Sequence, residues 1–322
     1  MSSEAAIRAA IPAELSTMVK QVKFADGIAT VIADASGLGR SAMAQLQREL
    51  VAAIEVLDGV SEVRVALMAD KVQRKIIVVG SGKGGVGKST LTTNLAVALA
   101  NMGLKVGVVD ADIYGPSQTL LLGTQDTKVR AEGQTLIASE TDFGVTMLSM
   151  GQLIEPGRAI AWRGPMVGKA LAQLMEADWG DAELLLVDLP PGTGDVQLTM
   201  LQQFKPAGAV VVSTPQDLAL IDATRAIDLF RQAEVPVVGL VENMAGYLCP
   251  ECGAVSAPFG QGGTEAAAQA LGVPFLGRVP LAMAIRVASD TGQPPAANPG
   301  EFQGYFAGIA AQVAAFLKGG QG

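Results

Sequence analysis

The chain has 322 residues, of which 49% are hydrophobic and 17% charged, a balance that suits an α/β protein with a buried parallel sheet. The net charge of −8 and the pI of about 4.7 argue against sequence-independent binding to DNA or to an anionic membrane. No apolar run reaches the ~18 residues that would span a bilayer, and residues 1–12 lack a signal-peptide or transit pattern. Two cysteines and no histidine indicate a reducing compartment, so we expect a cytoplasmic protein.

Residues 1–70 are predicted to form a small α/β domain of their own. Residues 27–33 and 60–67 have strand patterns, and between them apolar residues recur at helical spacing. These helical residues are Met43, Leu46, Leu50, Ile54 and Leu57. A polar connector, residues 69–74, separates this domain from a second domain over residues 75–322. The first domain contains no motif with chemistry, so we expect a docking or packing role for it.

In the second domain, apolar strands alternate with helical stretches. The predicted strands cover residues 75–79, 105–109, 184–187, 209–213, 237–241 and 275–278, and the predicted helices cover 89–102, 168–175, 218–232 and 264–271. This alternation implies right-handed crossovers and a mostly parallel sheet flanked by helices. Ligands of such a sheet bind at the carboxyl ends of its strands.

A glycine-rich run follows the first of these strands and fits the phosphate-binding pattern G-x-x-x-x-G-K-[ST]. The run comprises Gly82, Lys83, Gly84, Gly85, Val86, Gly87, Lys88, Ser89 and Thr90. The backbone N–H groups of such a loop converge on phosphate oxygens. Lys88 is expected to reach the β/γ-phosphates, and the Ser89 hydroxyl to ligate Mg²⁺. Because the order strand, loop, helix aims a helix N-terminus at an anion, the chain is predicted to bind a nucleoside triphosphate.

Acidic residues follow two other predicted strands. Asp110 and Asp112 come after residues 105–109, and Asp188 opens the segment Asp-Leu-Pro-Pro-Gly-Thr-Gly-Asp at 188–195. Carboxylates at this edge of the sheet suit a Mg²⁺ shell and the positioning of an attacking water. An Asp-x-Asp alone is more often a solvated loop or a helix cap, but the matched phosphate loop favours the metal. The Pro/Gly stretch has the character of a switch that responds to the γ-phosphate.

Cys249 and Cys252 are the only thiols of the chain, and two residues separate them. A redox dithiol usually begins a helix, and no helix signal follows this pair. A zinc site or a cubane cluster needs four protein donors, whereas one chain without histidine offers two. The count therefore predicts a centre shared by two subunits across a two-fold interface, and it leaves zinc and iron–sulfur equally open.

Several motifs carry a resemblance to known families. The extra lysine of the loop, Lys83, resembles that of the deviant Walker A ATPases, the MinD/ParA-like group, in which it reaches across a dimer to the partner's nucleotide. Further motifs stand in the order typical of the Mrp/ApbC family of ATP-dependent iron–sulfur cluster carriers. They are Asp-Ala-Asp-Ile-Tyr-Gly-Pro-Ser at 110–117, Arg-Gly-Pro-Met at 163–166, the switch at 188–195, Ser-Thr-Pro-Gln at 213–216, Glu-Asn-Met at 242–244 and Cys-Pro-Glu-Cys at 249–252.

This resemblance covers residues 75 to about 300 and implies a P-loop NTPase fold, slow ATP hydrolysis and a homodimer that passes a labile [4Fe–4S] cluster from assembly scaffolds to apo-proteins. It favours the cluster over zinc. It implies that Asp110 and Asp188 belong to the Mg²⁺ environment and that Asp112 orients the hydrolytic water, acting with Lys83 and Lys88. Asn243 would read the nucleotide base. Residues 1–70 resemble the MIP18-like domain that often precedes such an ATPase.

Rival interpretations share the phosphate loop. A partition ATPase would need a basic face for DNA, against the acidic balance found here. A septum-positioning ATPase ends in a basic amphipathic helix, but Lys318 is the only basic residue after Arg286, so the apolar pattern over 302–316 is expected to pack in the core. We therefore expect no nucleic-acid and no membrane partner. A zinc-bridged dimeric ATPase is a further alternative. A metal-pump or nitrogenase-reductase role also stays open, although the Cys-Pro-Glu-Cys spacing favours the carrier family.

Overall fold

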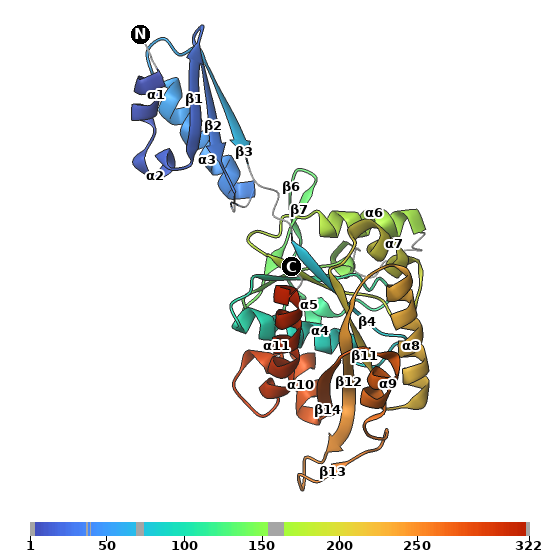
Figure 1. Cartoon of the computed structure of the whole chain (residues 1–322). Coiled ribbons are helices and arrows are strands. Elements are labelled where there is room, and N and C mark those ends of the chain that lie inside the picture. The colour runs from blue at the N-terminus through green and yellow to red at the C-terminus, as the bar shows by residue number, and fades with distance from the viewer. Residues whose placement is uncertain (1–3, 37, 39, 69–73, 154–163, 320–322) are drawn as a thin grey trace. The chain divides into compact units, whose positions relative to one another are not determined.

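The computed structural model describes residues 4–36, 38, 40–68, 74–153 and 164–319. The chain divides into two compact units (Figure 1). The smaller comprises residues 1–73 and 178–181, and the larger comprises residues 74–177 and 182–322.

The smaller unit is built around a three-stranded sheet in the order β1-β2-β3. β1 (Val19–Ala25) pairs antiparallel with β2 (Ile28–Asp34), and β2 pairs parallel with β3 (Glu62–Met68). The crossover between the parallel strands is α3 (Arg40–Glu55), and α1 (Glu4–Ala10) and α2 (Ala13–Ser16) precede the sheet. Buried residues of α1, β2 and α3 form one apolar core, among them Ile7, Val31, Leu50 and Ile54. The sequence predicts β2, α3 and β3 but not β1, α1 or α2.

The larger unit contains a nine-stranded sheet in the order β13-β12-β11-β4-β10-β5-β9-β8, with β14 beside β12. Its strands are β4 (Lys75–Gly80), β5 (Val106–Asp110), β8 (Ser139–Glu140), β9 (Val145–Ser149), β10 (Leu184–Asp188), β11 (Gly208–Ser213), β12 (Val237–Leu248), β13 (Val255–Ser256) and β14 (Phe275–Leu281). Only the pairings of β8 and β13 are antiparallel. The central strands are buried from end to end, as expected where helices cover both faces.

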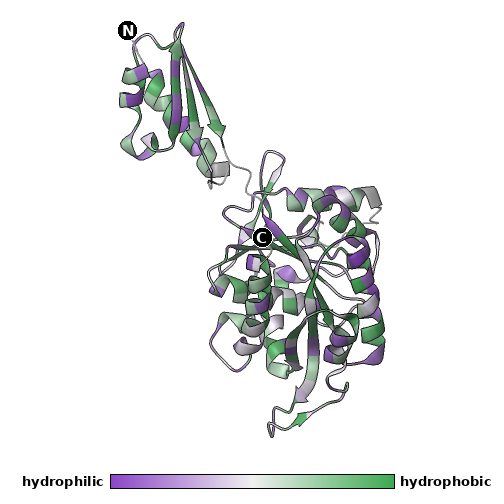
Figure 2. Cartoon of the chain, in the orientation of Figure 1, coloured by the Kyte–Doolittle hydropathy of each residue, from purple (hydrophilic) through white to green (hydrophobic). Residues whose placement is uncertain are grey.

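Helices flank both sides of this sheet, with α4, α10 and α11 on one side and α7, α8 and α9 on the other (Figure 1). The helices of this unit are α4 (Lys88–Asn101), α5 (Gln118–Leu121), α6 (Gly164–Met175), α7 (Asp195–Phe204), α8 (Asp217–Gln232), α9 (Gly263–Leu271), α10 (Met283–Asp290) and α11 (Gln303–Gly319). Short 3-10 turns occur at Met150–Leu153 and Pro295–Ala297. The strands β6 (Arg130–Glu132) and β7 (Thr135–Ile137) form a separate small hairpin. Hydrophobic residues concentrate on the central strands (Figure 2).

The six strands and four helices predicted for this unit are all present, and the doubly flanked, mostly parallel sheet is confirmed. As expected, α11 packs in the core through residues such as Phe306, Ile309 and Val313. The sequence patterns do not predict β9, α7 and α10 or the short elements α5, β6, β7, β8 and β13, and they end β12 at residue 241 instead of 248, seven residues too early. Within the described ranges, no helix has both the length and the apolar character needed to cross a bilayer.

Candidate functional site

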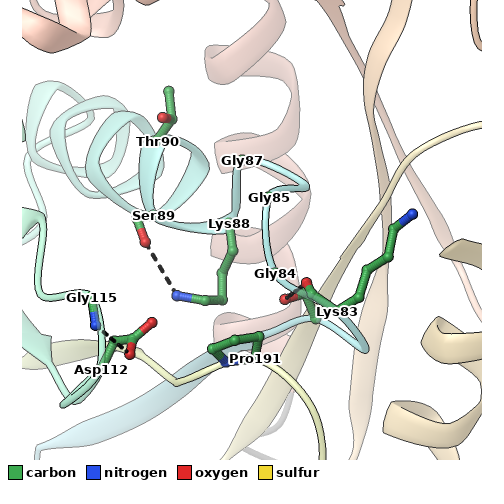
Figure 3. Close-up of a pocket in the computed structure, with 11 residues that line it drawn as sticks. Lys83, Gly84, Gly85, Gly87, Lys88, Ser89, Thr90, Asp112, Gly115 and Pro191 are labelled. Carbon is green, nitrogen blue, oxygen red and sulfur yellow. Dashed lines mark hydrogen bonds between the residues drawn. The ribbon is translucent and has the colours of Figure 1, made fainter.

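The phosphate loop lies at the carboxyl edge of the parallel sheet. The register of β10 places Asp188 beside Val79 of β4 on one side and beside Asp110 of β5 on the other. A cavity of about 250 Å³ opens there (Figure 3). It is lined by Ser81, Lys83, Gly84, Gly85, Gly87, Lys88, Ser89, Thr90, Asp112, Gly115 and Pro191. The loop and Asp112 thus meet at one cavity, where an α/β sheet binds its ligands.

The glycines of the loop are required by its geometry. Gly85 and Gly87 have φ values of 78° and 80°, a left-handed conformation that other L-residues adopt only at a cost. A Cβ at Gly82 would lie 2.1 Å from the carbonyl group of Asp222 in α8, so no side chain fits at residue 82. The loop ends where α4 begins at Lys88, and the N-terminus of that helix provides a site for a phosphate.

Lys88 is paired with Asp188 inside the protein. The Lys88 Nζ lies 2.5 Å from Asp188 Oδ1, and the two side chains are 6% and 0% exposed. The Lys88 Nζ is also 3.2 Å from the Ser89 hydroxyl, so loop, helix and strand meet at this ammonium. A buried pair of this kind is costly to break by removing one partner, whereas a phosphate would offer the lysine a second anion.

Asp110 anchors the loop that follows β5. Its Oδ2 accepts hydrogen bonds from the backbone N–H groups of Ser117 and Gln118, both at 3.0 Å, and from the Ser149 hydroxyl at 2.9 Å, and its Oδ1 accepts one from the Asp112 N–H at 3.2 Å. Burial, reinforced by the nearby Asp188 carboxylate, raises the pKa of Asp110 to about 7, and the hydrogen bonds oppose this shift. The geometry gives Asp110 a role in shaping the loop, while its part in a Mg²⁺ environment stays a prediction.

Asp112, in contrast, faces the cavity. Its Oδ1 accepts hydrogen bonds from the N–H groups of Tyr114 and Gly115, both at 3.1 Å, and it lies near Lys88 and Pro191 (Figure 3). The Ser89 hydroxyl and the Asp112 and Asp188 carboxylates are hard oxygen donors, which suit Mg²⁺. The donor chemistry present therefore fits that ion.

The switch segment contacts the residue that immediately precedes the phosphate loop. The N–H of Gly192 donates to the Ser81 carbonyl at 3.0 Å, and Pro191 lines the cavity. Gln197 of α7 braces the segment, since its side chain accepts from the Gly194 N–H and donates to the Pro190 carbonyl, each at 2.6 Å. The structure thus brings the segment to the place where a γ-phosphate sensor would be needed.

Lys83 lines the cavity, but its ammonium group points away from Lys88 (Figure 3). Its Nζ donates to the side-chain oxygen of Gln216 at 3.2 Å, at the start of α8. The side chain of Thr90 also points away from Lys88 (Figure 3). Of the two loop lysines, Lys88 is the one whose ammonium group lies beside Ser89 and Asp188.

Asn243 is half-buried and contacts the phosphate loop. Its Nδ2 donates to the Val86 carbonyl at 2.7 Å, and a Cβ at Gly87 would come within 2.1 Å of the same atom. This close approach is possible because residue 87 is glycine. Recognition of the base by Asn243 stays a prediction.

Cys249 and Cys252 lie in the turn of a β-hairpin formed by the end of β12 and β13. Leu248 pairs with Val255, and the Cys249 N–H donates to the Ala254 carbonyl at 3.0 Å. This hairpin extends beyond the neighbouring strands (Figure 1), and Cys252 is exposed while Cys249 is half-buried. Hydrogen bonds from the backbone of Cys252 and Glu251, and from the Cys252 side chain, lower the pKa of the Cys249 thiol, which favours the thiolate that a metal binds.

The hairpin supplies too few ligands for a metal centre by itself. Among the residues that the structure describes, no group of three or more His, Cys, Asp or Glu side chains could hold a metal ion. The cysteines are also not among the residues that line the phosphate-loop cavity. Of the other motif residues, Arg163 lies outside the described residues and Met166 is in α6.

Sequence reasoning missed polar residues that organise the site. Gln118 and Ser149 are fully buried and contact the aspartates, but a lone glutamine or serine gives no signal in a sequence. Glu242 is also fully buried; it accepts from the Thr264 N–H at 2.9 Å and pairs with Arg278 at 3.0 Å. Glu242 belongs to the Glu-Asn-Met motif at 242–244, but that motif gives no indication of its contacts with Arg278 and Thr264.

Comparisons with known proteins agree with this geometry. The ParA family described as "NUBPL iron-transfer P-loop NTPase" matches residues 71–314. An iron-sulfur cluster carrier protein of Pseudomonas fragi is 45% identical over 76% of this chain and 90% of its own length. A nucleotide-binding protein of Archaeoglobus fulgidus, solved with ADP, is 37% identical with a TM-score of 0.62, covering 72% of this chain and 91% of that one. The cell division ATPase MinD of Pyrococcus furiosus is 27% identical with a TM-score of 0.57, covering 75% of this chain and 98% of that one.

Proposed function

Because this chain belongs to the ParA family of NUBPL-type iron-transfer P-loop NTPases, we propose that it hydrolyses ATP slowly and carries a labile [4Fe–4S] cluster to apo-proteins. The observation that carries the proposal is the cysteine hairpin, which offers two free thiols at the surface. The same chain has a phosphate-loop cavity for the nucleotide. The carrier name of the Pseudomonas fragi relative supports it.

The nucleotide half of the proposal assigns roles to residues of the cavity. Lys88 leaves Asp188 to bind the β/γ-phosphates, and the backbone N–H groups of the glycine loop hold the remaining phosphate oxygens. Ser89 and Asp188 would hold Mg²⁺, which neutralises phosphate charge when it is bound with ATP. Asp112, which lines the same cavity, orients the attacking water, and Asp110 keeps the Asp112 loop in place through its hydrogen bonds.

The cluster half of the proposal requires a second copy of the chain. Each copy brings the Cys249 and Cys252 sulfurs, and four thiolates complete a cubane cluster. A two-fold axis near the hairpins would bring the pairs face to face. The exposure of the hairpin supports such a contact, and it also supports transfer, because a cluster at the surface is accessible to an acceptor once the copies separate.

Lys83 would link nucleotide binding to cluster binding. Its Nζ hydrogen-bonds to the neutral amide of Gln216, and a phosphate would offer this ammonium an anionic acceptor in exchange. From there Lys83 would reach the nucleotide of the second copy, so that ATP biases the geometry of the dimer that holds the cluster.

For the smaller unit we keep the interpretation of a MIP18-like docking domain over residues 1–70, which lies outside the range matched by the family. Its own buried core supports an independent domain. We also propose a reducing, cytoplasmic environment, which the two free thiols support.

Anaerobic reconstitution with iron and sulfide tests the cluster half. Wild-type protein is expected to show the absorbance of a [4Fe–4S] cluster with equal iron and sulfide, and C249S/C252S to show neither. S256A, on the same hairpin, is the matched control and should load like wild type. Loading of zinc with no sulfide would instead establish the zinc-bridged dimer.

Cluster transfer to an apo-acceptor in the presence of ATP tests the coupling. K88A removes the phosphate-binding lysine and should transfer more slowly than wild type, whereas K318A, an exposed lysine at the end of α11, should not. Equal transfer by K88A and wild type would refute nucleotide coupling while leaving cluster binding intact.

A further inference from the structure

A buried glutamine fills the space between the phosphate loop and Asp188. Gln118 is the first residue of α5 and is 0% exposed. Its Nε2 donates to the Ser89 carbonyl and to Asp188 Oδ2, both at 3.0 Å. Its Oε1 accepts from the Thr93 hydroxyl at 2.6 Å. One side chain therefore joins the first turn of α4 to the carboxylate at the end of β10.

The chemistry of these contacts fixes the orientation of the amide. A flipped amide would point its oxygen at the Ser89 carbonyl and the Asp188 carboxylate, which are both acceptors. The backbone of the same residue is also held, since the Gln118 N–H donates to Asp110 Oδ2 at 3.0 Å. Gln118 thus contacts both buried aspartates, one through its backbone and the other through its side chain.

Gln118 and Lys88 hold different oxygens of Asp188. Oδ1 receives the Lys88 ammonium at 2.5 Å and lies 3.1 Å from the Thr92 hydroxyl. The Thr92 proton is shared with the Lys88 carbonyl, 3.0 Å away. When Lys88 moves to a phosphate, the amide on Oδ2 becomes the firmest of these contacts. Because that donor is neutral, it holds the carboxylate without cancelling the negative charge that a Mg²⁺ ligand needs.

We propose that Gln118 is a positioning residue for Mg²⁺-dependent nucleotide hydrolysis, which keeps Asp188 oriented once Lys88 has left it. The inference rests on the proposed function only in requiring that the chain hydrolyses a Mg²⁺-nucleotide. In this role Gln118 would contact neither the phosphates nor the attacking water and would act through the Asp188 carboxylate that it orients.

The test compares Q118L and Q118E with wild type and with Q269L, an exposed glutamine of α9. ADP affinity is measured by calorimetry in EDTA and again with Mg²⁺, and hydrolysis is followed as a function of Mg²⁺ concentration. We expect ADP affinity in EDTA to change by less than about twofold, because the phosphate loop is intact. The gain in affinity due to Mg²⁺ and kcat should each fall about tenfold, the size expected for a hydrogen bond to a charged group.

Q118E should lose at least as much, because it sets a second carboxylate against Asp188. The proposal is overturned if both variants keep the Mg²⁺ dependence of wild type. It is also overturned if ADP affinity falls equally with and without Mg²⁺, which would mean a structural role only. Should Q118L fail to fold, T93V removes only the hydroxyl that fixes the amide, and it should shift the same Mg²⁺ dependence by a smaller factor.

Failure of the proposed function would look different. If wild type binds ADP but hydrolyses no ATP, the hydrolysis claim fails, and the Mg²⁺ dependence of ADP affinity still decides the role of Gln118. If wild type hydrolyses ATP and Q118L matches it at every Mg²⁺ concentration, only the role of Gln118 is refuted.

Discussion

Replacing Gly87 by alanine should destabilise the larger unit through a collision that can be relieved at a second position. Gly87 has φ of 80°, and a Cβ there would lie 2.1 Å from Asn243 Nδ2. The left-handed conformation costs an alanine about 1–2 kcal/mol. Displacing Asn243 also breaks its 2.7 Å hydrogen bond to the Val86 carbonyl, which adds about 1 kcal/mol. We therefore expect G87A to lower the free energy of unfolding by about 2–3 kcal/mol.

Gly103 provides a matched control. Its φ is 90° and nothing lies within 4 Å of a Cβ built there, so G103A should show the backbone cost alone, about 1–2 kcal/mol. In the double variant G87A/N243A the collision is gone and the hydrogen bond is already lost. The combined effect should therefore be smaller than the sum of the single effects by about 1 kcal/mol.

The assay is urea unfolding of the full-length variants without nucleotide, followed by far-UV circular dichroism and extrapolated to water. Additive effects of G87A and N243A, or equal losses for G87A and G103A, would show that Asn243 does not press against the loop. The contact between β12 and the phosphate loop described above would then be wrong.

Three other predictions concern ionisable groups. In C252S, the rate of Cys249 alkylation by iodoacetamide should rise with pH with a midpoint below the ordinary thiol pKa of 9.0, because backbone N–H groups lower the pKa of this thiol. A midpoint equal to that of the urea-unfolded protein would contradict this. R278M leaves the buried Glu242 carboxylate without its cation and should lower the free energy of unfolding by about 2–3 kcal/mol. This loss is smaller than for a fully buried pair because Arg278 is partly exposed. The double variant R278M/E242Q should recover part of the loss. Burial raises the pKa of Asp110 from 3.8 to about 7. Between these two pH values the folded state therefore binds a proton that the unfolded chain has released. Relative to D110N, wild type should therefore lose stability as pH rises from about 4 to about 7 and change no further above that; a difference that does not vary with pH in urea unfolding would refute the shift.

The sequence predicts the parts of this protein that a local pattern dictates. The phosphate loop is fixed by residue spacing, and the parallel sheet follows from strands that alternate with helices. The second half of β12 could not be found, because residues 242–248 include Glu, Asn and Gly and become a strand through pairing with β13 and β14. β9 likewise depends on its place beside β5, and its Ser149 reaches Asp110 only in the folded chain.

The same limit applies within the site. The sequence places Asp110 and Asp112 at the right edge of the sheet but does not distinguish them. In the structure Asp110 ends a buried strand and is bound by its own loop, while Asp112 lies beyond the strand and lines the cavity. The hydrogen bonds that lower the pKa of the Cys249 thiol come first from the backbone of the turn and then from the Cys252 side chain, so residue spacing alone shows a pair of thiols and not their chemical state.

The central claim is that two chains share one cluster through Cys249 and Cys252. Native mass spectrometry of anaerobically reconstituted protein measures chains, iron and sulfide in one particle. The account predicts a dimer with four iron and four sulfide atoms, and an empty particle for C249S/C252S. A single chain that carries the full set of iron and sulfide would contradict it.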